Sequence, residues 1–273
     1  MIDYESNFRE KEFYHNVESA KKLARKRINK DKNDPWSYLV LGNAYGAKAV
    51  YEAKKGNWWS GLNEGLRAKS ALKQAIECDP ELYDAYVGLG SYHYWASVMT
   101  RALWWLPFVG DHREQGISEI KLAYEKSIFS QAAAASGLMW IHIEEKQYQQ
   151  AISLAQKMQS RYARGKLFLW PLAEAYFRKR DWNSALLNYR ELLGRIEDEH
   201  SSGNPDQSYN VIECKFYIAN SLFGLARYAE CDSVCKDILN LSFDEKIQER
   251  QKAKLKSIKT LSQRCSEMLG RKD

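Results

Sequence analysis

The side chains with the clearest capacity for chemistry include a group of cysteines near the C-terminus. Cys231 and Cys235 lie one helical turn apart and Cys214 precedes them, so that thiolate ligands for a zinc ion could come together. None of the five cysteines shows the Cys-x2-Cys spacing of zinc sites. Buried cysteine packs as a small hydrophobic residue. We therefore predict that Cys231 and Cys235 are packing residues and that the chain has no metal site.

A second set, Asp111, His112 and Glu114, places two carboxyl groups and an imidazole within four residues. These groups could act in general acid–base catalysis. An aspartate followed three residues later by glutamate is also the pattern of a capping box at a helix start, and we predict this structural role. The sequence contains no Walker loop, GxGxxG, HExxH or GxSxG motif. It therefore predicts a protein that is not an enzyme, with no catalytic residues and no cofactor.

Nearly the whole chain has the apolar spacing of amphipathic helices, and no alternating strand pattern is sustained. Clusters of glycine, proline and asparagine interrupt this pattern at short intervals, as at Asp34-Pro35, Lys55-Gly56-Asn57 and Asp79-Pro80. Helices of this length joined by short turns indicate antiparallel hairpins. The sequence thus predicts an all-α protein.

Small residues at one position of the second helix show that the hairpins repeat. Ala20, Ala68, Gly116, Ala151 and Ala185 are separated by 48, 48, 35 and 34 residues. A period of 34 is typical of one class of helix-turn-helix repeat. The two longer intervals carry about 14 additional residues, which corresponds to about two turns on each helix of a hairpin. We therefore predict two lengthened hairpins followed by three of ordinary length.

The first helices and second helices carry the residues that define this class. Tyr38-x2-Leu41-Gly42-x2-Tyr45 is followed by Ala68, and Leu169-x2-Leu172-Ala173-x2-Tyr176 is followed by Ala185. This pattern resembles that of the tetratricopeptide-repeat superfamily. The segments 61–66, 84–90 and 109–116 are also similar to uncharacterised bacterial repeat proteins and to the tetratricopeptide repeat protein 39 group. The resemblance implies an adaptor-like function.

The resemblance implies a right-handed superhelical α-solenoid that forms a single domain over residues 1–273. Its expected parts are an N-terminal helix in 1–33, lengthened hairpins in 35–127, shorter hairpins in 131–240 and a capping helix in 244–271.

The inner face of such an array is lined by first-helix residues that lie off the packing stripe. Aromatic side chains mixed with a few polar groups suit a bound peptide, although the curvature could also bury some of them. The predicted concave-face residues are Trp36, Asn43, Asp84, Tyr94, Trp140, Trp170, Glu174, Phe177 and Arg178. They predict a scaffold that holds a protein or peptide partner.

Two tryptophan pairs, Trp58-Trp59 and Trp104-Trp105, fall at the expected tips of the lengthened hairpins, with Phe108 close to the second pair. These side chains could bind a partner or lie at a membrane interface. Alternatively, the indoles pack against one another and against Phe108. The sequence leaves these three interpretations open.

The net charge of +6 is concentrated in residues 21–32 and 246–272. These basic stretches are either solvated helix faces or sites of attraction to an acidic partner, an anionic membrane or nucleic acid. Nucleic acid is the least favoured of these, because no base-stacking or phosphate-binding motif accompanies the charge. The N-terminus lacks the pattern of a signal peptide. We expect a cytoplasmic protein, or a periplasmic one if a signal has been removed.

Overall fold

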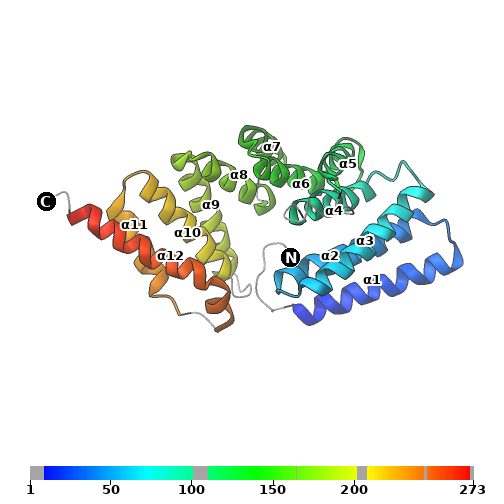
Figure 1. The fold of residues 1–273 in the computed structure, drawn as a ribbon, viewed down its shortest axis with the longest axis horizontal. Coiled ribbons are helices and arrows are strands. Elements are labelled where there is room, and N and C mark those ends of the chain that lie inside the picture. Colours follow the sequence, from blue (N-terminus) through cyan, green and yellow to red (C-terminus); the bar gives the residue numbers. More distant parts are fainter. Residues whose placement is uncertain (1–8, 101–109, 164, 202–207, 243–244, 271–273) are drawn as a thin grey trace. The chain divides into compact units, whose positions relative to one another are not determined.

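A computed structural model describes residues 9–100, 110–163, 165–201, 208–242 and 245–270. Within these ranges the regular elements are α-helices joined by short turns (Figure 1). The helices are α1 Glu10–Lys30, α2 Pro35–Lys54, α3 Trp58–Cys78, α4 Ala85–Met99, α5 Arg113–Lys126, α6 Gln131–Glu144, α7 Tyr148–Arg161, α8 Lys166–Lys179, α9 Trp182–Ser201, α10 Ser208–Gly224, α11 Tyr228–Leu239 and α12 Glu245–Gly270. The predicted all-α class is confirmed for this part of the chain.

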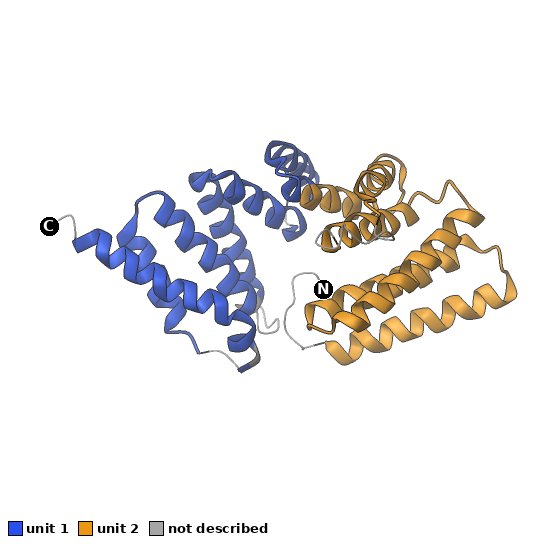
Figure 2. Cartoon of the chain, viewed as in Figure 1, with its two compact units in different colours: residues 1–8, 142–273 blue, residues 9–141 orange. Residues whose placement is uncertain are grey.

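The chain divides into two compact units, shown in separate colours in Figure 2. The N-terminal unit comprises Arg9–Ile141, and the C-terminal unit extends from His142 onwards. None of the described helices is both long enough and apolar enough to cross a membrane. The assignment of residues 1–273 to a single domain stays a prediction.

In the N-terminal unit, α2 and α3 form the first long hairpin, and α1 packs against α2. The helices approach closely because α2 has glycine where a side chain would collide with α3. A β-carbon on Gly42 would lie 2.6 Å from Cγ of Leu72. Leu72, which is almost fully buried, packs with Leu39, Ala75 and Leu89, so that residues of α2, α3 and α4 share one core.

Four of the hairpin turns use the same backbone device. A residue one or two positions after the first helix has a positive φ: Gly56 at 85°, Lys146 at 59°, Arg180 at 63° and Ala226 at 57°. In each case the amide of the following residue donates to a carbonyl five residues earlier, as from Asn57 to Glu52. This is the Schellman arrangement that ends a helix and satisfies its last carbonyls. The chain therefore reverses in the same way in these four hairpins, whatever the length of their helices.

The hairpin of α4 and α5 corrects one expectation. Its helices contain 15 and 14 residues within the described ranges, against 20 and 21 in α2 and α3. Residues 101–109 lie outside the described residues, so the predicted lengthening of this hairpin stays a prediction. The amide of His112 donates to Oγ of Ser97 at 2.9 Å. The predicted capping box is wrong. His112 occupies the N-cap without a side-chain hydrogen bond, and Asp111 accepts from the amide of Arg113.

The C-terminal unit has its own core between α8 and α12. Tyr189, Leu222 and Ile258 belong to this core together with Cys231 and Cys235. Cys231, Cys235 and Cys265 are fully buried. Hydrogen bonding to Cys235, together with burial, raises the pKa of the Cys231 thiol, so the thiol remains protonated. Cys231 and Cys235 therefore pack as predicted, with α12 placed against both α10 and α11.

Candidate partner-binding surface

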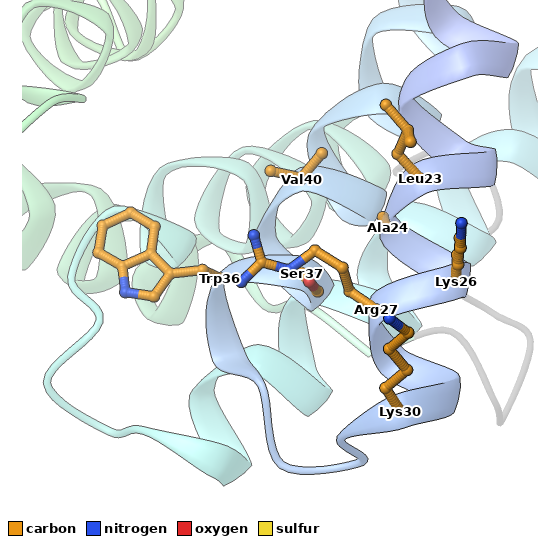
Figure 3. A pocket seen from close by; sticks show the side chains of 8 residues that line it. All are labelled: Leu23, Ala24, Lys26, Arg27, Lys30, Trp36, Ser37 and Val40. Carbon is orange, nitrogen blue, oxygen red and sulfur yellow. The ribbon is translucent and has the colours of Figure 1, made fainter.

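A groove between α1 and α2 combines exposed apolar side chains with a basic rim (Figure 3). Leu23 on α1 is 64% exposed, and Trp36 and Val40 on α2 are 42% and 45% exposed. Lys26, Arg27, Lys30, Ala24 and Ser37 complete the lining of the groove, which has a volume of about 450 Å³. Such a combination offers an apolar contact beside positive charge. We call the apolar group Leu23, Trp36, Val40 and Phe129 the Trp36 surface.

The start of α2 is fixed by Asp34, and this fixes the position of Trp36 two residues later. Oδ1 of Asp34 accepts from the amide of Ser37 at 3.1 Å, and Oδ2 accepts from the Ser37 hydroxyl at 2.5 Å. Nε of Arg27 donates to the same Oδ2 at 3.1 Å. The hydrogen bond from the Ser37 side chain is the main cause that lowers the pKa of Asp34. Asp34 therefore anchors both helices of the groove, and Figure 3 shows Arg27 extending from α1 towards α2.

Phe129 extends the Trp36 surface from a different part of the chain. Its ring meets the Trp36 indole edge to face, with 5.9 Å between the ring centres, and it is 75% exposed. The segment that carries it is held by Asp84, whose carboxylate accepts from the amides of Ile128, Phe129 and Ser130 at 3.2, 2.9 and 2.7 Å. Asp84 thus presents Phe129 at the surface.

The basic rim lies on α1 alone. Lys26 and Lys30 are exposed, and neither forms an ion pair within the ranges that the structure describes. The Arg27 side chain is 71% exposed although it pairs with Asp34. Solvated charges of this kind gain little from internal pairing but attract an acidic partner.

The structure corrects two of the predicted concave-face residues in the N-terminal unit. Asp84 is buried and its carboxylate is occupied by the three amides described above, so it cannot contact a partner. Tyr94 is fully buried in the core. The pattern misplaced both because their burial depends on α5 and on residues 128–130, which lie far along the chain. Trp36, Asn43 and Trp140 are exposed, as a contact surface requires.

In the C-terminal unit some of the predicted concave-face residues are buried and others are exposed. Glu174 is buried and accepts from Nε of Arg178 and from the Tyr189 hydroxyl, both at 2.7 Å. Phe177 lies 4.8 Å from the Tyr217 ring, and Trp170 is partly buried near Tyr189. The Arg178 side chain is the one that stays open, at 59%. Of these four, Glu174 is therefore corrected to a structural residue.

The first tryptophan pair is open to solvent. Trp58 is 61% exposed and Trp59 is 81% exposed at the start of α3. Leu62 and Leu66 on the same helix are also exposed. The second pair and its neighbour, Trp104, Trp105 and Phe108, lie outside the described residues.

Sequence reasoning missed two members of the Trp36 surface, Leu23 and Phe129. Leu23 has basic neighbours in the sequence. Such neighbours indicate a solvent-exposed helix face, so the leucine side chain could have been expected to be exposed. Phe129 follows Ile128 at the junction of two hairpins, where paired large apolar residues are unusual for a turn. The signals were present, but only the structure shows that Phe129 contacts Trp36 and that Leu23 lines the same groove as Trp36.

No protein-family model matches the sequence, and no curated protein matches it significantly. Solved structures do match. YrrB, described as a TPR protein with an unusual peptide-binding site, superposes with a TM-score of 0.53 at 13% identity, over 86% of this chain and 100% of that chain. The Cut9–Hcn1 hetero-tetramer of the APC/C gives 0.55 at 14% identity, over 93% of this chain and 46% of that chain.

PilF of Pseudomonas aeruginosa gives a TM-score of 0.50 at 14% identity, over 84% of this chain and 90% of that chain. At these identities the likeness shows the fold, which is that of the tetratricopeptide-repeat proteins. The predicted helical-repeat array is therefore confirmed. The narrower similarity to the tetratricopeptide repeat protein 39 group stays a prediction.

Proposed function

We propose that this chain, which has the tetratricopeptide-repeat fold, is a non-catalytic scaffold that binds an acidic, amphipathic peptide of a partner protein on the Trp36 surface. One observation carries the proposal. Trp36, Val40 and Phe129 expose a contiguous apolar area beside the exposed ammonium groups of Lys26 and Lys30. An exposed tryptophan is a frequent anchor of protein interfaces, and the basic rim favours a partner with acidic residues next to its apolar ones.

The fold of the neighbours supports the same function. YrrB is described by its peptide-binding site, and Cut9–Hcn1 is a complex of two proteins. Helical repeats expose extended faces that suit such partners. For this chain the surface to test is that of α1 and α2, because its geometry is described in full and its apolar residues come from three separate elements.

The experiment is selection of a displayed library of random 12-residue peptides against the whole chain. We expect enriched peptides that combine acidic and large apolar residues. Trp36→Ala should weaken their binding by at least about thirtyfold, since truncation of a central anchor costs about 2 kcal/mol or more. Trp59→Ala is the matched control, because it removes an indole that is even more exposed elsewhere on the same unit. Equal loss in both variants, or no enrichment, would contradict the proposal.

A second candidate function is contact with a membrane surface through the start of α3. Trp58, Trp59, Leu62 and Leu66 are all exposed there, and aromatic and aliphatic side chains on one helix can enter the interface of a bilayer. Flotation with anionic liposomes at low and moderate salt tests this candidate. Membrane contact requires that the wild-type chain floats with the liposomes and that the double variant Trp58→Ser with Trp59→Ser does not. The control variant Trp36→Ala should float like the wild type.

A further inference from the structure

A second cleft in the N-terminal unit shares no residue with the Trp36 surface. It has a volume of about 460 Å³ and lies among α1, α2 and α3. The lining combines two arginines, three hydroxyl groups and an amide with two aliphatic side chains. Its residues are Arg25, Tyr38, Leu41, Tyr45, Arg67, Ser70, Ala71 and Gln74. Arginine from two different helices in one cleft is a combination that recognises oxyanions.

The two guanidinium groups converge on one ring. Cζ of Arg25 lies 5.8 Å from the centre of the Tyr45 ring, and Cζ of Arg67 lies 5.9 Å from it. Arg25 also donates through Nη2 to the Tyr45 hydroxyl at 2.5 Å. Tyr45 is buried, so it holds a fixed position between α1 and α3. Both guanidinium groups therefore lie beside the same buried ring.

The charges around Tyr45 do not balance among the described residues. Lys21 pairs with Glu18 at 2.6 Å, and Lys48 lies between Glu18 and Glu64, at 3.4 and 3.2 Å. Arg67 reaches the same oxygen of Glu64 only at 3.5 Å, and its side chain stays 59% exposed. Arg25 is exposed, and its recorded hydrogen bond is to the neutral Tyr45 hydroxyl. Three cations thus share two carboxylates and Arg25 adds a fourth positive charge, which leaves an excess of positive charge around Tyr45 among the described residues.

We propose that this cleft binds the phosphate group of a phosphorylated side chain in a partner peptide. A phosphate monoester carries nearly two negative charges and three acceptor oxygens near neutral pH, which suits the excess of cations and the forked donors of Arg25 and Arg67. The Ser70 hydroxyl, exposed on α3, adds a donor at the same cleft. That the phosphate is carried by a peptide rests on the proposed scaffold function, whereas the binding of the phosphate group itself rests on the cleft alone.

The test measures fluorescence anisotropy of three labelled peptides of one sequence that carry phosphoserine, serine or glutamate at the central position. The whole chain should bind the phosphoserine peptide at least about tenfold more tightly than the serine peptide, because charge-assisted hydrogen bonds are the strong ones. Arg25→Gln with Arg67→Gln should remove this preference. Lys22→Gln with Lys73→Gln, which removes the same charge from exposed positions of α1 and α3, should retain it within about twofold.

The double variant Arg25→Lys with Arg67→Lys keeps both positive charges but lacks the forked donors of the guanidinium groups, so its affinity for the phosphoserine peptide should be intermediate. Circular dichroism of each variant shows whether a loss of binding comes from a folding defect. Loss of the preference in the Lys22 and Lys73 control would overturn the proposal. So would equal affinity for inorganic phosphate, or tighter, Arg25-dependent binding of a 12-nucleotide single-stranded DNA. Failure of the proposed function would be seen in a different experiment. That function requires that Trp36→Ala weakens the binding of the selected library peptides and that the arginine variants leave it unchanged.

Discussion

Two carboxylates that do not belong to the Trp36 surface hold its aromatic side chains in place. Asp34 caps α2 and joins it to Arg27 of α1, and Asp84 holds the backbone on which Phe129 is exposed. Neither carboxylate is a contact residue. Each compensates backbone amides or a guanidinium group that would otherwise lack an acceptor, and it thereby sets the place of an aromatic side chain. At the scale of the residue, then, the acidic groups shape the surface while apolar and basic groups are left to bind.

Asp34 makes this support dependent on pH. Its pKa is lowered from 3.8 in the folded chain, so its stabilising contribution is complete above pH 3.8 and is lost as the pH falls through the lower folded-state value. Asp34→Ala should cost about 1 kcal/mol at neutral pH, as for other N-caps. Asp34→Asn retains the cap but not the charge.

Hydrogen exchange of the amides in α2, measured by mass spectrometry between pH 3 and pH 6 and corrected for the intrinsic rate, checks this prediction. The wild type should lose protection of α2 towards the acid end, and Asp34→Asn should show a smaller dependence. If the two chains depend on pH in the same way, the acid loss comes from other groups and Asp34 has no such role.

At the scale of the element, close contact between helices rests on glycine at specific positions. Gly90 and Gly116 face each other across α4 and α5, and a β-carbon on Gly116 would lie 2.6 Å from the carbonyl oxygen of Gly90. Because the colliding atoms belong to the backbone, a side chain there must push the helices apart. Gly194 in α9 differs, since no atom lies within 4 Å of a β-carbon built on it.

Gly116→Ala should therefore lower the free energy of unfolding by about 1–3 kcal/mol, as overpacked sites do. Gly194→Ala should raise it by about 0.5–1 kcal/mol, because alanine reduces the freedom of the unfolded chain in a helix with room for a methyl group. Thermal unfolding followed by circular dichroism compares the two. A stabilised Gly116→Ala chain would show that α4 and α5 are not in close contact.

Residues whose partners lie nearby in the sequence could be assigned from the sequence, and residues whose partners lie far along the chain could not. Leu41, Gly42 and Tyr45 are buried as the repeat pattern predicts, since their partners are in the next helix and their spacing is local. Asp84 could not be assigned in this way, because the amides that it binds lie 44 to 46 residues further along the chain. An interval of 48 residues likewise does not say whether a helix or a connection is the longer part.

At the scale of the whole molecule, each unit has its own buried residues. Leu72 packs with residues of α2, α3 and α4 in the N-terminal unit, and Leu222 packs with residues of α8 to α12 in the C-terminal unit. In a repeat protein stability is close to a sum over neighbouring elements. The candidate surfaces all belong to the N-terminal unit, so their integrity should depend on the stability of that unit.

Leu222→Ala and Leu72→Ala should each cost about 2–5 kcal/mol, because both side chains are almost fully buried. We expect the losses to be separate, since local opening follows cooperative subunits of the structure. Hydrogen exchange should increase in α10 and α11 for Leu222→Ala and in α2 and α3 for Leu72→Ala, with the other set nearly unchanged. Peptide binding at the Trp36 surface should then survive Leu222→Ala and weaken with Leu72→Ala. Equal increases throughout the chain in both variants would mean that the two units unfold as one, and that binding depends on the whole array.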